Sequence, residues 1–148
     1  MNTANRSGEG NGGLRQLPGP LVLIGAGKMG GALLDGWLKF GFDPARIVVI
    51  EPQPSPAISA LAARGLHLNP NAAAATAAAA VVIAVKPQAA GEALAAAAPS
   101  VAASTVVVSI MAGRTIQSLA RGLPQDCALV RAMPNLPAAI CAEENALG

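Results

Sequence analysis

Short apolar runs alternate with segments of helical periodicity along most of the chain. Runs rich in aliphatic residues occupy positions 20–24, 47–50, 66–68, 80–85, 105–110 and 128–132, and they are typical of strands buried in a parallel sheet. Apolar residues at helical spacing predict helices over 28–40, 58–64, 72–78, 87–98 and 115–123. This alternation predicts an α/β fold, a doubly wound and mainly parallel Rossmann-like sheet with helices on both faces, in three layers.

Residues at the predicted boundaries support this order of elements. Ser55, which precedes Pro56, and Thr115 are expected to be N-caps, because a hydroxyl oxygen can accept a hydrogen bond from a free N–H of the first helical turn. Gly41 and Gly65 are expected at helix C-termini, where a left-handed residue ends the helix.

The first apolar run ends in a glycine-rich turn with the pattern G-x-G-x-x-G. Gly25 permits a tight turn, Gly27 lets a pyrophosphate lie against the backbone, and Gly30 lets the next helix pack close to the first strand. The N–H groups at the start of that helix would bind phosphate without a basic side chain. Glu51 ends the next apolar run, 21 positions after Gly30, where a ribose-binding carboxylate belongs. The alternative is a turn with only a structural role, since the chain has 16 glycines.

Other unusual residues also follow predicted strands at their carboxyl ends. In open α/β sheets ligands gather outside these ends. We therefore expect one crevice to collect the glycine turn, Glu51, Lys86 with Pro87, residues 111–113 and Asn135.

Composition excludes several classes of function. The net charge of +2 is too small to indicate a polyanion partner, and aromatic residues make up only 2%, so we expect no nucleic-acid partner. Residues 72–85 are uncharged but too short and alanine-rich for a membrane span. Cys127 and Cys141 do not have metal-ligand spacing, so we expect no metal site and free thiols in a reducing compartment, the cytoplasm.

The 148 residues fit one domain. Residues 1–18 are rich in Gly, Asn and Ser without periodicity and predict a disordered tail. Residues 19–140 form the predicted dinucleotide-binding domain, and residues 141–148 are a divergent end.

Four segments occur in the order and spacing of one known family. They are residues 24–30 (IGAGKMG), 84–88 (AVKPQ), 109–113 (SIMAG) and 131–138 (RAMPNLPA). Together they resemble the amino-terminal domain of pyrroline-5-carboxylate reductase, over residues 20–140. The resemblance implies an oxidoreductase that reduces the C=N bond of 1-pyrroline-5-carboxylate to L-proline with NADPH or NADH, the last step of proline biosynthesis.

The resemblance also implies roles for individual residues. The cofactor-binding set would be Ile24, Gly25, Ala26, Gly27, Lys28, Met29 and Gly30 around the pyrophosphate, Glu51 and Pro52 at the adenosine ribose, Asn71, and Ala84, Val85, Lys86, Pro87, Ile110, Met111 and Ala112 on the nicotinamide side. Asn135 would lie near the substrate ring. No catalytic residue is assigned, because hydride transfer depends mainly on positioning. Inert surface or turn roles remain the alternatives for Lys86 and Asn135.

Glu51 slightly favours NADH over NADPH. Its carboxylate can accept a hydrogen bond from a ribose 2′-hydroxyl and would repel a 2′-phosphate, and no Arg follows directly to bind that phosphate. Gln53 and Ser55 are the neutral donors of the same loop.

The sequence departs from the family at two places. Leu136 stands where the family usually has Thr, and the resemblance fails after Ile140, where family members continue into a helical domain that forms homo-oligomers. We therefore expect a truncated chain that holds the cofactor half, has little activity with the imine, and is either monomeric or aggregation-prone. A stand-alone dinucleotide-binding module or non-catalytic remnant is the alternative, and a deazaflavin-dependent NADP reductase relative is a third hypothesis.

Overall fold

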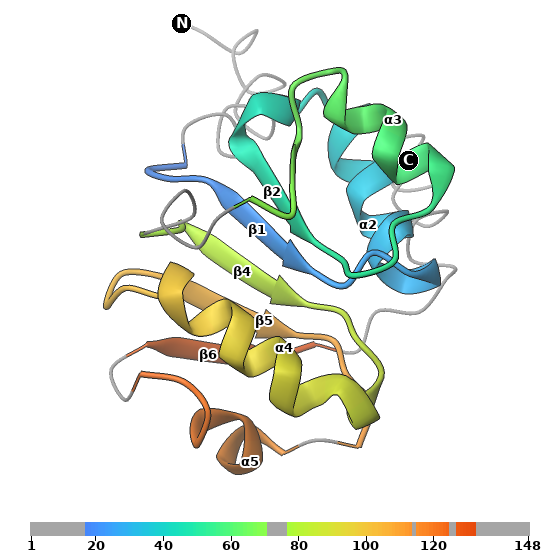
Figure 1. Ribbon diagram of the computed structural model, residues 1–148. Helices are drawn as coiled ribbons and strands as arrows, with labels where there is room; N and C mark the ends of the chain where they lie inside the picture. The colour runs from blue at the N-terminus through green and yellow to red at the C-terminus, as the bar shows by residue number, and fades with distance from the viewer. Residues whose placement is uncertain (1–16, 71–76, 114, 125–126, 133–148) are drawn as a thin grey trace, which may run out of the picture.

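The computed structural model describes residues 17–70, 77–113, 115–124 and 127–132, and these form a six-stranded parallel sheet (Figure 1). The strands are β1 (Leu21–Ile24), β2 (Ile47–Ile50), β3 (His67–Leu68), β4 (Ala80–Ile83), β5 (Val106–Ser109) and β6 (Ala128–Arg131). Their order across the sheet is β3-β2-β1-β4-β5-β6. The chain builds outward from β1 to β3 and then returns to the other side of β1, so the strand order reverses between β1 and β4. The predicted doubly wound fold is confirmed.

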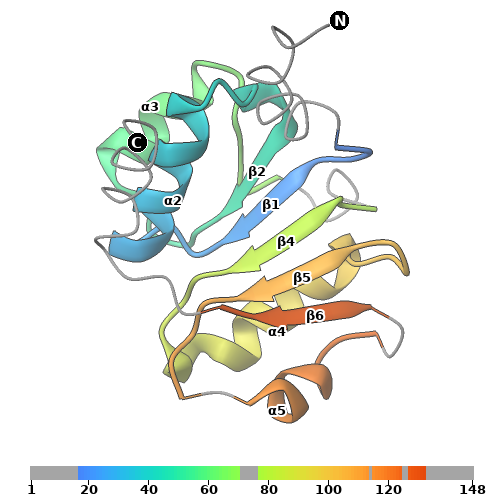
Figure 2. The same cartoon turned by 180° about the vertical axis from the view of Figure 1, so that it is seen from behind.

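Helices cover both faces of this sheet. The α-helices are α2 (Lys28–Lys39), α3 (Pro56–Ala62), α4 (Ala90–Ala97) and α5 (Ile116–Ala120), and short 3₁₀ turns occupy Pro44–Arg46, Pro87–Ala89 and Ala98–Ser100. Figures 1 and 2 show α2 and α3 on one face of the sheet and α4 and α5 on the other. The fold therefore has the three predicted layers.

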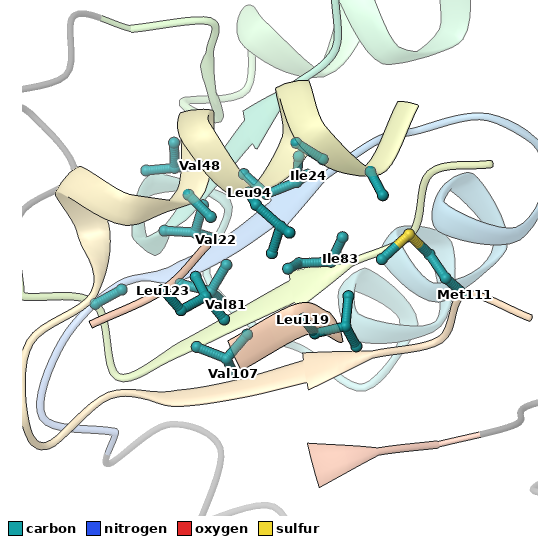
Figure 3. Packing of buried hydrophobic residues seen from close by; sticks show 14 residues of the cluster. Val22, Ile24, Val48, Val81, Ile83, Leu94, Val107, Met111, Leu119 and Leu123 are labelled. Atoms are coloured by element: carbon teal, nitrogen blue, oxygen red, sulfur yellow. The ribbon is translucent and has the colours of Figure 1, made fainter. Parts of the chain in front are cut away.

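Alternate residues of β1 point to opposite faces of the sheet and join two different cores. Leu23 packs with Leu34 of α2 and Ile58 of α3. Ile24 packs with Leu94 of α4 in the second core (Figure 3). Because β1 is buried on both faces, the turn that follows it has a rigid base.

The predicted helix boundaries are confirmed at several residues. The Ser55 hydroxyl accepts a hydrogen bond from the Ile58 N–H at 3.2 Å, and the Thr115 hydroxyl accepts one from the Ser118 N–H at 3.1 Å. Gly41 has φ +84° and directly follows Phe40, the C-cap of α2. Helix α3 begins two residues before its predicted start because the Ser55 cap and Pro56 initiate it.

The helix predicted over residues 72–78 does not extend to its predicted end. Residues 71–76 lie outside the described part of the chain, but Ala77 has φ +55° and is in a turn. The Ala78 N–H donates to the Ser100 carbonyl oxygen at 2.9 Å, and the Ala79 N–H donates to the Pro20 carbonyl oxygen at 2.9 Å. These tertiary bonds take backbone donors that a helix would have used, so they override the helix propensity of alanine.

The chain is anchored to the domain from its first described residue. Residues 1–16 of the predicted tail, and residues 133–148 with the predicted divergent end, lie outside the described part. Leu17 packs against the core beneath α2 and α3, and the Arg46 guanidinium donates to the carbonyl oxygens of Leu17 and Gly19. In the described ranges, no helix combines the length and apolar character that a membrane span requires.

Thr105 carries a prediction about stability. Its side chain is fully buried, and its hydroxyl donates to the Ala78 carbonyl oxygen at 2.6 Å and accepts from the Ala102 N–H at 2.9 Å. Thr105→Val keeps the shape but removes both bonds, so we expect the free energy of unfolding to fall by about 1–3 kcal/mol. Urea denaturation measures this. Thr105→Ser, which keeps the hydroxyl, should lose less, and a Val variant as stable as wild type would contradict the role of this hydroxyl.

Candidate functional site

Four loops that carry predicted site residues lie at one edge of the sheet. They follow the carboxyl ends of β2, β1, β4 and β5, which are consecutive neighbours in the parallel sheet. The glycine turn and the Lys86 loop are adjacent because β1 pairs directly with β4. This edge is also where the strand order reverses, the place at which open α/β sheets bind ligands. Asn71 and Asn135, the other predicted site residues, lie outside the described residues.

The glycine turn fits against its neighbours so closely that two of its glycines admit no side chain. Gly25 has φ +92°, and a Cβ there would lie 2.7 Å from Val85 Cγ1 and 2.8 Å from the Ala84 carbonyl oxygen. A Cβ on Gly30 would overlap the Gly25 carbonyl oxygen and lie 3.2 Å from Ala84 Cβ. The first turn of α2 therefore packs directly on the ends of β1 and β4, as the sequence pattern predicted for Gly30.

Gly27 is the opposite case, because its backbone faces open space. A Cβ built on Gly27 meets no atom within 4 Å, and the residue is exposed. Gly27 is also the N-cap of α2, which begins without a side-chain cap and has no acidic residue in its first turn. Lys28 is exposed. An anion could therefore approach the N–H groups and the positive dipole end of this helix without displacing a side chain.

Glu51 joins the end of β2 to the glycine turn. Its Oε1 accepts a hydrogen bond from the Ala26 N–H at 3.1 Å, and its Oε2 accepts one from the Gln53 N–H at 3.2 Å. The glycine turn forms another hydrogen bond to β2, in which the Gly25 N–H donates to the Ile50 carbonyl oxygen at 2.8 Å. Glu51 is half-buried, its carboxylate lies beside the turn, and the residue lines the same open space as Gly27.

The loops after β4 and β5 offer mostly backbone to the same edge. Ala84, Val85 and Pro87 are half-buried and Lys86 is exposed. Ile110 is half-buried and Ala112 is exposed, but the Met111 side chain is 2% exposed and packs in the core beneath α4 and α5 (Figure 3). Met111 could therefore reach a ligand only through its backbone, unlike its exposed neighbour Ala112.

A groove of about 660 Å³ begins at the glycine turn and runs between α2 and α3. Its apolar lining includes Leu34, Ile58 and Leu61. Polar or small residues of the glycine turn and of the loop after β2 also line it: Ala26, Gly27, Glu51, Gln53 and Ser55. Pro52 is exposed on the same loop. Within the described ranges, no group of three or more His, Cys, Asp or Glu residues could hold a metal ion.

Asn69 contacts a residue of the candidate site and was not among the residues predicted from the sequence. It has φ +48°, and its side-chain amide forms two hydrogen bonds to the backbone of Glu51. The available signal was its position at the end of the short strand and directly before Pro70, since Asn tolerates the left-handed conformation better than most residues. The sequence interpretation instead selected Asn71 from the same turn.

Comparisons with known proteins agree with this geometry. Residues 20–113 match the profile of the family described as "NADP oxidoreductase coenzyme F420-dependent". Pyrroline-5-carboxylate reductase of Escherichia coli is 36% identical over 119 residues, which cover 79% of this chain and 44% of the relative. The enzyme of that name from Mycobacterium tuberculosis is 35% identical over 133 residues, covering 86% of this chain and 45% of the relative.

Solved structures show the same resemblance in three dimensions. A pyrroline-5-carboxylate reductase from Coxiella burnetii superposes with a TM-score of 0.69 at 28% identity, covering 82% of this chain and 46% of that protein. Pyrroline carboxylate reductase from Plasmodium falciparum, with NADP bound, gives 0.67 at 25% identity, covering 84% and 45%. The chain thus spans less than half the length of these relatives, and the resemblance inferred from the four sequence motifs is confirmed.

The contrast between two glycines of α2 gives a direct test of the turn geometry. Gly30→Ala should destabilise the protein by about 1–3 kcal/mol because the added methyl group meets the Gly25 carbonyl oxygen. Gly36→Ala in the same helix meets nothing within 4 Å and should stabilise it by about 0.5–1 kcal/mol, since alanine is the better helix former. Thermal and urea unfolding compare the two. Equal effects of both substitutions would show that the turn is not tightly packed.

Proposed function

The chain belongs to the family described as NADP oxidoreductase, coenzyme F420-dependent, and on this premise we propose that it is the dinucleotide-binding part of an NAD(P)H-dependent pyrroline-5-carboxylate reductase. The observation that carries the proposal is the open backbone at Gly27, with the Glu51 carboxylate beside the turn, at the point where the strand order reverses. The proposed substrate comes from the names of the relatives. The proposed cofactor is supported by the chain's own residues at this edge.

The residues at this edge fit a dinucleotide. The pyrophosphate would lie on the N-terminus of α2 against Gly27, where an added Cβ would project into otherwise open space. Glu51 and Pro52 would face the adenosine ribose. Ala84 to Pro87 and Ile110 to Ala112 would line the nicotinamide end, so the two ends of the cofactor would lie at the carboxyl ends of β2 and of β4 with β5.

The reduced nicotinamide would supply the hydride that reduces the C=N bond of the imine. The protein's own contribution at this edge is to bind the cofactor and orient its nicotinamide ring. The loops that would hold the ring follow strands of a sheet that is covered on both faces, and this restricts the position of the ring. The half-buried side chains of Val85 and Ile110 would shield one side of that ring from water. Asn135 remains the proposed neighbour of the substrate.

The hydrogen bonds of Glu51 favour NADH. Both carboxylate oxygens are held by backbone N–H groups, and each oxygen keeps acceptor capacity for a ribose hydroxyl. A 2′-phosphate would instead meet a fixed negative charge. The loop after Glu51 has no cation that could bind a 2′-phosphate, since Gln53 and Ser55 are neutral. Arg64 also lines the groove, but it lies after the end of α3.

The description of the family favours a second candidate, a reductase that transfers hydride between NADP and coenzyme F420. The two hypotheses differ in their second substrate. Incubating the chain with NADPH and oxidised coenzyme F420, and in parallel with NADH and 1-pyrroline-5-carboxylate, would distinguish them. Loss of the absorbance of oxidised coenzyme F420 would support the second candidate, whereas slow formation of proline without that loss would support the first.

Glu51→Gln tests the cofactor preference. Removing the charge should lower the Kd for NADPH and raise the Kd for NADH, shifting their ratio by about tenfold, which corresponds to about 1.4 kcal/mol. Fluorescence titration of both dinucleotides measures the two constants. Glu92→Gln on the exposed side of α4 makes the same charge change on the other face of the sheet and should leave the ratio unchanged. A wild-type chain with a strong preference for NADPH would contradict the argument from Glu51.

Cofactor binding and reductase activity are tested with the purified 148-residue chain. We expect it to bind NADH weakly and to form little proline from 1-pyrroline-5-carboxylate, because it spans only about 44% of the length of its reductase relatives. Isothermal titration and amino-acid analysis of the product measure the two quantities. Absence of dinucleotide binding would overturn the proposed function, and rapid proline formation would overturn the expectation that catalysis needs further residues.

A further inference from the structure

We propose that Asn69 is a positioning residue that holds the Glu51 carboxylate against the glycine turn and thereby sets the preference of the site for NADH over NADPH. This inference rests on the proposed function and adds a residue to it. Asn69 would not touch the cofactor. It would act through Glu51, because its side chain binds both the backbone N–H and the carbonyl oxygen of that residue.

The side chain of Asn69 takes the place of a strand neighbour. β2 and β3 pair in register as far as Val49 with Leu68, and the Asn69 N–H donates to the Val49 carbonyl oxygen at 2.8 Å. Beyond that bond the chain turns away into Pro70, which has no N–H to donate. The Asn69 side chain continues the pairing: its Oδ1 accepts from the Glu51 N–H at 2.8 Å, and its Nδ2 donates to the Glu51 carbonyl oxygen at 2.8 Å.

Asn69 therefore binds the backbone of the residue whose carboxylate binds the glycine turn. Glu51 is the first residue after β2, and without Asn69 its backbone would have no sheet neighbour on the β3 side. Its side chain then bridges to Ala26 in the turn and to Gln53 in its own loop. Fixing the backbone of Glu51 removes the freedom that would otherwise let the carboxylate leave the turn for water.

The left-handed backbone of Asn69 makes asparagine the suitable residue. At φ +48° most side chains are strained, whereas Gly, Asn and Asp tolerate this region. Among these, only asparagine has both a donor and an acceptor at neutral pH. Aspartate could accept from the Glu51 N–H but could not donate to its carbonyl oxygen, and it would add a negative charge beside the Glu51 carboxylate. Glycine would keep the backbone conformation and lose both bonds.

The experiment measures the Kd of NADH and of NADPH for Asn69→Gly and Asn69→Asp. For Asn69→Gly we expect the Kd of NADH to rise about fivefold to tenfold while that of NADPH changes by less than about twofold. Asn69→Asp should raise both, because the new charge also opposes a 2′-phosphate. Gln117→Glu, an exposed residue of α5, is the matched control for exchanging an amide for a carboxylate and should change neither constant.

Two further measurements separate positioning from a general loss of stability. In the Glu51→Gln background, Asn69→Gly should produce no further change in the ratio of the two constants, because the carboxylate that it positions is gone. Amide hydrogen exchange of the free protein should accelerate at Glu51 and Ala26 in Asn69→Gly, with little change in the core strand β1.

The outcomes distinguish this inference from the proposed function. A wild-type chain that binds NADH, together with an Asn69→Gly variant that keeps the wild-type ratio, overturns the role of Asn69 and leaves the proposed function standing. A wild-type chain that binds neither dinucleotide overturns the proposed function and the selectivity role together. Additive effects of Asn69→Gly and Glu51→Gln on the ratio would also overturn the inference, because Asn69 would then act independently of the carboxylate.

Discussion

The contact between the first turn of α2 and the ends of β1 and β4 is the constraint on which the rest of the site depends. Gly30 packs on the Gly25 carbonyl oxygen, and Gly25 packs on Ala84 and Val85, with no room for a Cβ at either position. This contact points the N-terminus of α2 at the edge where the strand order reverses. If α2 stood further from β1, its free N–H groups and dipole would no longer face the loop after β4.

The second constraint comes from the neighbouring strands. Glu51 and Asn69 directly follow β2 and β3, and polar groups of both residues continue the hydrogen bonding of the sheet beyond its last regular pair. The glycine turn is therefore held from one side by packing on β4 and from the other by hydrogen bonds to β2. A loop fixed on two sides loses little conformational freedom when it binds a ligand, which favours affinity.

Much of this arrangement could be predicted from local patterns. The β-branched run Ile47–Ile50, the Ser55 cap and the spacing of Gly25, Gly27 and Gly30 each indicate a feature that the structure contains. The prediction failed where local preference and tertiary bonding disagreed. Alanine favours helix at Ala77, yet the backbone that follows donates to Ser100 and Pro20. No local pattern carries information about such distant acceptors.

The sequence by itself determined the order of the elements, the parallel sheet and the position of the candidate site, because apolar periodicity and glycine spacing are local properties of the chain. Only the tertiary structure decided that Met111 faces the core, that the Glu51 carboxylate is held by Ala26, and that Asn69 completes the end of β2. These contacts join residues far apart in sequence. Their geometry depends on strand register and on the direction of each side chain, which follow from how the whole sheet packs.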